Sequence, residues 1–449
     1  MKKLLFILII SLFFLPVLYA GGNSEKDNKG EVNSISEEIP AHNNEAVSAD
    51  EESSSDENAD EEKKKRKRSG ISDRIVEITL FHADVFFANN LISAFDVFKE
   101  TIEFNFDDLS KGLRFNMGAM IDLPSFRFKS KKGWGFGLYT KAEVYGVVDI
   151  AGEMLRLQTA DNAKSVLSGA AFASASVDAF FPVNKFTLKI KPSVYYTLMY
   201  IKPEINYTFN KENGIILDLN YDIMAYTPFP LNGEGFSLSA LSAKPGADIS
   251  LGFEYPISRA IGLYNKKPFL DFDIGVDIKQ IPIVPSSMSD YMRVSGRIAN
   301  DDPVTIEDNF DAIGKFIDDL GSNIYNSENG NETLRITRPF KTMLWTAWRP
   351  IGGKRILTLN FSVGFEINKM YDKLFSMEGG FGAKFNFGNI FMIAAAVNYT
   401  DRMWVNSLDL TFNFRVIQLD LGVNMRSQDF IQSWKGAGVG ARVGMKIGW

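Results

Sequence analysis

Apolar and polar residues alternate with a period of two along most of this chain after about residue 71. In residues 269–279, leucine, phenylalanine, isoleucine and valine alternate with aspartate, glycine and lysine. The same alternation runs through residues 355–368 and 406–415. Because a β-strand sends successive side chains to opposite faces, each stretch predicts a strand with one apolar face. Other stretches of this kind are 112–123, 133–139, 215–225, 248–257, 381–387 and 418–426.

The stretch at residues 436–449 shows this alternation in a form that allows two interpretations. Val439, Val443 and Trp449 belong to a wholly apolar face, whereas the opposite face is glycine interrupted only by Arg442 and Lys446. A soluble sheet has this pattern when its apolar face packs on a core. A barrel strand has it when the apolar face meets lipid and the other face lines the lumen. One strand does not decide between them.

The number of alternating stretches favours the barrel. We count about 14 strands, and at most about 16, whereas a β-sandwich hides its apolar faces with about seven to nine. A bilayer would cover the outside of so large a sheet, and closure would remove its edges. We therefore predict an all-β fold, a transmembrane antiparallel β-barrel of about 14 strands over residues 112–449. The count depends on residues 186–209, where the alternation changes phase near Met199 through either a tight turn or a bulge.

The connections between the predicted strands differ in length. Residues 387–390 are typical of a two-residue hairpin turn, and residues 350–354 are a short loop rich in turn formers. Longer polar stretches follow at 227–246 and 286–335. Short turns at one end and long loops at the other are typical of outer-membrane barrels. Inside the second long loop, apolar residues recur at helical spacing between Ile306 and Leu320, which predicts a helix there.

The first 70 residues do not resemble the rest of the chain. Residues 1–20 combine two lysines, an apolar run and a small residue at Ala20, which predicts a signal peptide for export; an uncleaved membrane anchor is the alternative. Residues 21–70 are rich in Ser, Asn, Asp and Glu and end in the basic block 63–68, so we expect a disordered linker. This linker is either a solvated spacer or a tether to an anionic surface.

The composition points away from catalysis and metal chemistry. The chain has no cysteine, which excludes disulfides and cysteine–zinc sites, and its two histidines are His42 and His82. Asp271 and Asp273 point the same way from one predicted strand, as do Asp218 and Asp222. Such a pair either binds a cation or lines a hydrated lumen, and we favour the lumen wall. We therefore expect no enzyme activity, no cofactor and no metal, and no nucleic-acid partner.

The segment at residues 71–111 is the most informative part outside the predicted strands. It is apolar around a central Asn89–Asn90 pair and comes before the first convincing strand, so we expect it to fold back as a plug in the lumen. A plug followed by a barrel of about 14 strands resembles the FadL-type family of long-chain fatty-acid transporters. The resemblance implies transport of hydrophobic small molecules. It also implies that the plug contacts the solute through Phe86, Phe87, Leu91, Ile92, Phe95 and Phe98.

The stretch 442–449 resembles the signal by which bacterial outer-membrane proteins are recognised for assembly. That signal places a polar residue, a glycine, a hydrophobic residue and a terminal aromatic residue at fixed spacing. Arg442, Gly444, Ile447 and Trp449 occupy these places. The resemblance implies that the barrel assembly machinery is a partner and that the protein lies in the bacterial outer membrane, in contact with its lipid.

Two functions fit this sequence. The first is an outer-membrane channel for hydrophobic small molecules such as fatty acids. The second is a barrel without a transport role, an adhesin or structural protein that acts through surface loops such as 286–335. A general porin is a further alternative within the transport class. Whether the segment at residues 84–111 lies inside the lumen would distinguish the first function from the second.

Overall fold

The computed structural model describes residues 74–90, 112–150, 160–210, 216–228, 244–262, 268–299, 326–351, 356–371 and 374–449. The described residues form one large antiparallel sheet with two short helices and a single 3-10 turn. None of these helices is long and apolar enough to cross a membrane. The strands of the sheet are β1 (Val76–Asn89), β2 (Leu113–Asp122), β3 (Ser125–Lys129), β4 (Gly135–Ile150), β5 (Ala160–Val183), β6 (Phe186–Asn210), β7 (Ile216–Thr227), β8 (Gly246–Tyr255), β9 (Asp271–Val284), β10 (Ser286–Ala299), β11 (Asn326–Ile336), β12 (Phe340–Arg349), β13 (Leu357–Ile367), β14 (Phe375–Phe387), β15 (Phe391–Thr400), β16 (Met403–Phe414), β17 (Ile417–Ser427) and β18 (Gly438–Gly448).

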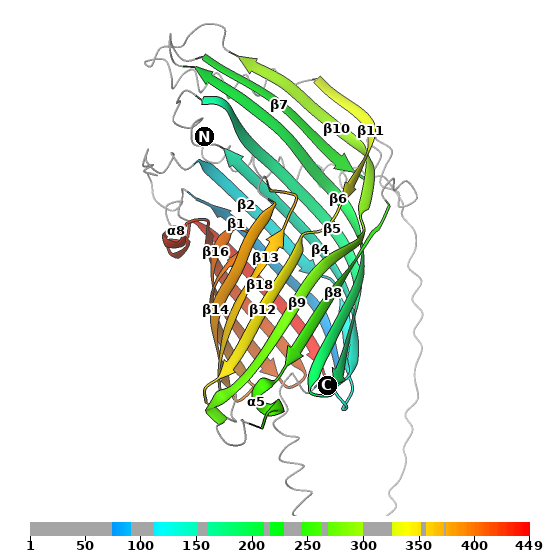
Figure 1. Ribbon diagram of the computed structural model, residues 1–449, viewed down its shortest axis with the longest axis vertical. Helices are drawn as coiled ribbons and strands as arrows, with labels where there is room; N and C mark the ends of the chain where they lie inside the picture. Colours follow the sequence, from blue (N-terminus) through cyan, green and yellow to red (C-terminus); the bar gives the residue numbers. More distant parts are fainter. Residues whose placement is uncertain are drawn as a thin grey trace, which may run out of the picture. The chain divides into compact units, whose positions relative to one another are not determined.

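The sheet closes on itself through its first and last strands (Figure 1). β1 pairs antiparallel with β18, from Glu77 opposite Gly448 to Ala88 opposite Gly438. On its other side β1 pairs with both β2 and β3, which together make one interrupted wall strand. The wall then runs through β4, β5, β6, β8, β9 and β12 to β18, so the closed barrel has 14 strands. This confirms the predicted fold class and strand number.

The two faces of the wall differ as the alternation predicts. Val85, Leu344 and Val423 lie on the outer face, and each is more than half exposed. On the inner face, charged side chains such as Asp84 and Glu143 are almost fully buried. A soluble sheet would bury the apolar face and expose the charges, so the arrangement is that of a transmembrane β-barrel, with lipid outside and a polar lumen.

Three further strands extend the sheet beyond the barrel rim (Figure 1). β6 pairs with β8 along its first half and with β7 along its second half. β7 in turn pairs with β10, and β10 with β11, so these strands form a four-stranded extension with the end of β6. We call the paired region of β6, β7, β10 and β11 the rim extension. The phase change near Met199 is a bulge rather than a turn, because Ala171 and Phe172 are paired with Met199 and Thr197 on an unbroken β6.

Two expectations about segment boundaries were wrong. Residues 76–89 form the wall strand β1, although we expected a plug over 71–111 and a barrel that began at residue 112. The expected loop 286–335 includes β10 and most of β11, while the predicted helix at 306–320 lies outside the described residues. In β1, a bulge between Thr79 and Phe81 shifts the register, so the period-two pattern is broken.

The turns at one end of the barrel follow the expected chemistry. Gly388 and Asn389 both have positive φ, at 65° and 62°, as a type I′ hairpin turn requires. Arg415 in the two-residue β16–β17 turn also has a positive φ, 59°. We call this end the short-turn end. Strands β1, β4 and β17 end at the opposite end, and because each is followed by a longer connection in the sequence we call it the long-connection end.

Candidate solute site in the barrel lumen

Ion pairs join neighbouring strands across the inner face of the wall. The guanidinium of Arg442 contacts Asp84 of β1 at 2.9 Å and Asp409 of β16 at 3.1 Å. Arg349 pairs with both Asp271 and Asp273. The aspartate pair that suggested a hydrated wall or a cation site is thus neutralised by an arginine from β12, because β12 lies directly beside β9.

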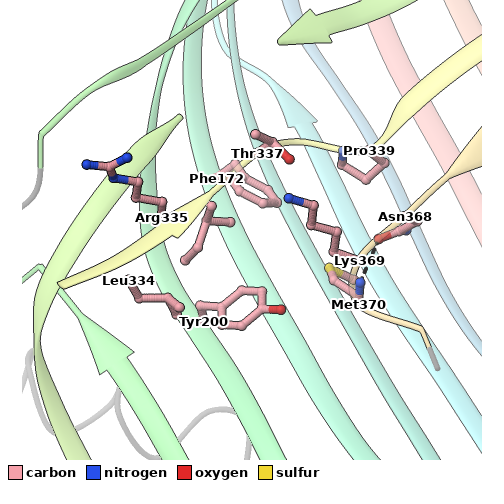
Figure 2. Close-up of a pocket in the computed structure, with 10 residues that line it drawn as sticks. Phe172, Tyr200, Leu334, Arg335, Thr337, Pro339, Asn368, Lys369 and Met370 are labelled. Carbon is pink, nitrogen blue, oxygen red and sulfur yellow. Dashed lines mark hydrogen bonds between the residues drawn. The ribbon is translucent and has the colours of Figure 1, made fainter. Parts of the chain in front are cut away.

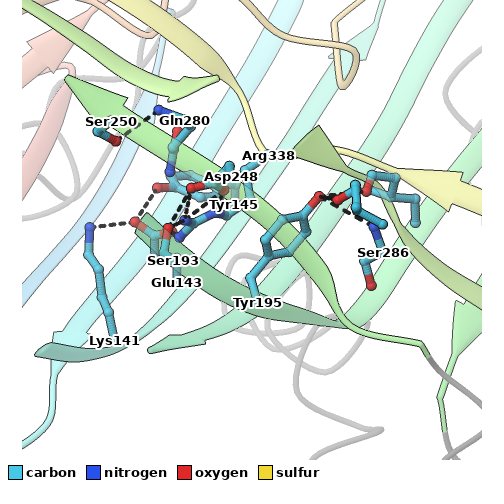
Figure 3. Close-up of polar contacts among 12 residues, drawn as sticks. Lys141, Glu143, Tyr145, Ser193, Tyr195, Asp248, Ser250, Gln280, Ser286 and Arg338 are labelled. Atoms are coloured by element: carbon cyan, nitrogen blue, oxygen red, sulfur yellow. Dashed lines mark hydrogen bonds and ion pairs between the residues drawn. The ribbon is translucent and has the colours of Figure 1, made fainter. Parts of the chain in front are cut away.

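A second network anchors the chain between β11 and β12, shown in Figure 3. Arg338 donates two hydrogen bonds to Asp248 of β8, both at 2.8 Å, and one to Ser193 of β6 at 2.7 Å. Its guanidinium also lies 5.0 Å from the ring centre of Tyr195 and 3.7 Å from a carboxylate oxygen of Glu143. All of these side chains are buried. The network therefore holds the β11–β12 connection against the inner wall.

A third cluster surrounds Lys341 of β12. Its ammonium lies 2.8 Å from Asp401, 2.9 Å from Glu378 and 3.3 Å from Glu366. Oxygens of these three carboxylates lie within 4.8 Å of one another, a spacing that would suit a metal ion, but the lysine stands among them. Burial raises the pKa of Asp401, which lies in the turn after β15, but the nearby ammonium outweighs burial and holds that pKa below its ordinary value.

An apolar cluster, which we call the aromatic cluster, lies where the inner face of the wall meets the rim extension. Its buried members include Phe172 of β5, Tyr195 of β6 and Tyr226 of β7. The rings of Phe172 and Tyr195 meet edge-on with their centres 6.1 Å apart. The other buried members are Ala170, Met288, Ile336 and Met370, and Tyr145, Tyr200, Met224, Tyr291 and Leu334 pack against them.

The polar end of Tyr195 is satisfied although its ring is almost fully buried. Tyr195 donates to the carbonyl of Ile336 at 3.1 Å and accepts from the backbone N–H of Ser286 at 3.3 Å. Both partners lie where the rim extension meets the barrel wall. The ring of Tyr195 therefore stays buried in the apolar cluster, while its hydroxyl fixes the junction of the two sheets.

A cavity of about 40 Å³ opens beside the aromatic cluster (Figure 2), with room for about three water molecules. Phe172 and Tyr200 line it from β5 and β6, and Met370 lines it from the segment that follows β13. Met370 is fixed there because Ser168 donates a hydrogen bond to its carbonyl at 2.6 Å. The remaining lining residues are Leu334, Arg335, Ile336, Thr337, Pro339, Asn368 and Lys369.

The residues predicted to contact a solute lie in different places. Phe86 is on the inner face of β1, where the guanidinium of Arg426 lies 3.9 Å from its ring centre. Phe87, the next residue, alternates to the outer face and packs 5.8 Å from the ring of Phe115. Neither belongs to the aromatic cluster. The other four, Leu91, Ile92, Phe95 and Phe98, lie outside the described residues.

The residues of the expected assembly signal lie on the seam between β18 and its neighbours. Arg442 makes the ion pairs with Asp84 and Asp409, and Gly444 lies opposite His82. Ile447 pairs with Ile417. Trp449 is 63% exposed, and its carbonyl accepts from the N–H groups of Ile75 and Val76. Their role in assembly stays a prediction.

The aromatic cluster was missed by sequence reasoning. The stretch 193–200 contains Tyr195, Tyr196 and Tyr200, and this concentration of tyrosine was the available signal. Tyr195 and Tyr200 share the inner face only because of the bulge between them, while Tyr196 points outward. Met288 and Met370 join them through pairings that only the sheet topology reveals.

The closed wall, apolar outside and charged inside, defines the class of this protein as a transmembrane β-barrel with an apolar site in its lumen.

No family model and no curated protein matches the chain. Solved structures of similar architecture include the toluene transporter TodX of Pseudomonas putida, with 9% identity, a TM-score of 0.46, and coverage of 84% of this chain and 90% of that one. The toluene transporter TbuX of Ralstonia pickettii has 9% identity, a TM-score of 0.42 and the same coverage. A FadL homologue of Pseudomonas aeruginosa has 10% identity, a TM-score of 0.42, and coverage of 83% and 89%. The likeness is one of barrel architecture.

Proposed function

We propose that this protein is a bacterial outer-membrane channel for hydrophobic small molecules. The observation that carries the proposal is the aromatic cluster, an apolar site with its own cavity in a barrel whose inner wall also carries several networks of ion pairs. Such a site binds a solute by removing its apolar surface from water, which contributes about 25 cal/mol per Å². A general porin has no use for it, because a hydrophilic solute gains nothing there.

The route to this cavity involves two segments that lie against the inner wall. The cavity holds only a few water molecules, so an organic solute must displace a lining side chain. Met370 is suited to this, because its unbranched thioether adapts to many shapes. The other lining segment, between β11 and β12, is anchored by the Arg338 network. We therefore propose that solute entry moves the side chain of Met370 while Arg338 stays in place.

The outer-membrane location rests on other parts of the chain. Residues 1–20 resemble an export signal, and Arg442, Gly444, Ile447 and Trp449 resemble an assembly signal. Lipid and the barrel assembly machinery are the partners that these features imply. Fatty acids are one class of solute that would suit an apolar lumen site. Phe95 and Phe98, in the segment between β1 and β2, remain proposed solute contacts.

Met370→Asp tests the proposal, because it places a carboxylate beside the buried rings of the aromatic cluster, where burial of a charge is costly. We expect uptake of the hydrophobic probe N-phenyl-1-naphthylamine by proteoliposomes to fall about tenfold or more. A loss of about 1.4 kcal/mol in the free energy of probe binding at this site is enough for a tenfold effect. Asn424→Asp is the matched control, because it adds the same charge to the lumen beside Arg426. The control should keep wild-type uptake.

Single-channel conductance separates the alternatives. The wild type should conduct small ions weakly, because side-chain networks and the aromatic cluster occupy its lumen. A large steady conductance, with probe uptake unchanged in Met370→Asp and in the double variant Phe95→Asp/Phe98→Asp, would favour a general porin. Low conductance without any probe uptake in the wild type would favour a barrel that acts through its surface loops.

A further inference from the structure

The short helix α8 (Phe430–Trp434) lies on the outside of the barrel at the long-connection end (Figure 1). It belongs to the β17–β18 connection and begins at Asp429, whose side chain accepts from the N–H groups of Ile431 and Gln432. Lys435 ends the helix, and its N–H donates to the carbonyl of Gln432. The helix is thus a fixed part of the connection.

α8 packs on the outer face of β16. Leu408 is an exposed outward residue of this strand, so Asn406 and Trp404, two and four positions earlier, also point outward. The ring of Phe430 meets the ring of Trp404 edge-on, with 4.9 Å between their centres. The amide of Asn406 donates to the hydroxyl of Ser433 at 2.9 Å. Asn406 and Ser433 are buried by this contact.

The cover over Asn406 has a physical reason if this face meets lipid. An asparagine on the lipid side of a barrel has no water to bond, so its amide needs a partner from the protein. Ser433 supplies that partner for the N–H group of the amide, and its own hydroxyl donates to the carbonyl of Phe430 at 2.6 Å. In water the same amide would need no cover. The packing of α8 therefore covers the polar side chain of Asn406 and exposes apolar side chains in its place.

The surface that α8 presents outward is apolar and continuous with the lipid face of the wall. Phe430 is 46% exposed, Ile431 63% and Trp434 52%. β17, the strand beside β16 in the wall, carries the lipid-facing Val423, which is 60% exposed. Aromatic residues with one apolar and one polar edge are typical of membrane interfaces, and Trp434 and Trp404 both lie here.

We propose that α8 is an interfacial anchor, inserted among the lipid headgroups and upper acyl chains of the leaflet at the long-connection end. Its partner is lipid, because the exposed side chains of Phe430, Ile431 and Trp434 continue the lipid-facing wall, while the charged side chains, Asp429 and Lys435, stand at the two ends of the helix, where headgroups can solvate them. In bacterial barrels the short turns face the periplasm, so this leaflet is the outer one. The proposal rests on the barrel lying in a membrane, but not on its transport role.

The absence of cysteine makes single-cysteine labelling the direct test. The variants Ile431→Cys, Val423→Cys and Lys131→Cys, each with a nitroxide label, are reconstituted in phosphatidylcholine vesicles. Val423 reports the lipid-facing wall, and Lys131 reports an exposed turn at the short-turn end. The ratio of relaxation by oxygen to relaxation by a water-soluble nickel chelate then measures whether each label lies in lipid or in water.

We expect the ratio at residue 431 to be close to that at 423 and several-fold above that at 131. A ratio at 431 equal to that at 131, with 423 still in lipid, would overturn the anchor and leave the membrane barrel standing. If both 423 and 431 report water, the membrane barrel itself fails. Since all three positions are exposed, none of the substitutions removes a buried contact.

Discussion

At the scale of single residues, Lys341 is the cation whose loss the fold should tolerate least. Its ammonium contacts three carboxylates, and two of them, Glu366 and Glu378, are almost fully buried. Lys341→Met leaves these carboxylates facing one another without a cation. We expect the free energy of unfolding in urea at pH 7 to fall by about 3 kcal/mol, the usual cost of breaking a buried ion pair.

This loss should depend on pH. The nearby ammonium is what holds the pKa of Asp401 low, so without the lysine Asp401 takes up a proton more readily, and its neutral form no longer repels the other carboxylates. The difference in stability between Lys341→Met and the wild type should therefore shrink as the pH falls from 8 to 4. Lys384→Met, which removes an exposed lysine from β14, should cost less than about 1 kcal/mol at every pH. A loss in Lys341→Met that is equal at both ends of this range would contradict the role of charge repulsion.

Side-chain partners at this scale were the least predictable part of the molecule. The alternation placed Asp271 and Asp273 on one face, which is correct, but Arg349 is 76 positions further along the chain. Its pairing depends on β12 lying beside β9, although β10 and β11 come between them in sequence. Tyr195 and Met370, which are also far apart in the sequence, belong to one buried cluster because the sheet topology brings their segments together. Periodicity reveals the face of a residue but not its neighbour across strands.

At the scale of elements, strands with a polar inner face were predictable and strands with an apolar one were not. β9, β13 and residues 406–414 of β16 alternate clearly, because their inner residues are mainly aspartate, asparagine, serine, threonine, glycine or glutamate. At the start of β16 the inner residues Met403 and Val405 are apolar and pack with Ala88 and Phe86 of β1. In β1 the inner face includes Phe86 and Ala88, so both faces are apolar near its end. β10 belongs to the rim extension rather than the barrel wall, and its polar stretches were interpreted as a loop. The exceptions thus coincide with apolar patches of the lumen and with the rim extension.

The terminal strand carries a prediction about assembly. Trp449→Ala should sharply lower the amount of assembled barrel in the outer membrane, if Trp449 is read as part of an assembly signal. The stability of the barrel that does assemble should change by less than about 1 kcal/mol, because the side chain is 63% exposed and its backbone bonds to Ile75 and Val76 remain.

Phe414→Ala is the matched control for this experiment. Phe414 is an aromatic residue, 62% exposed, at the short-turn end of β16. The substitution Phe414→Ala should leave the amount of assembled barrel unchanged, as judged by immunoblot of purified outer membranes. Wild-type amounts of Trp449→Ala, or an equal loss in both variants, would show that Trp449 is not a specific signal.

At the scale of the whole molecule, a closed 14-strand sheet predicts how the purified protein behaves. Circular dichroism should show a β-rich spectrum, and unboiled samples should migrate differently from boiled samples on detergent gels. The reason is that closure pairs every wall strand on both sides, so that detergent alone does not open the sheet. A spectrum dominated by helix, or identical migration of both samples, would contradict the barrel.

The seam between β1 and β18 also makes the order of synthesis matter. Asp84 and Arg442, which pair across it, are 358 positions apart. While the ribosome is still making the chain, β1 has no β18 to pair with, and one of its edges stays unprotected until the final residues exist. A repeat protein that loses its last unit keeps most of its stability, because each unit contacts only its neighbours. Here a stop codon anywhere before residue 438 removes the strand that completes the ring, so even a late truncation should behave as a complete loss.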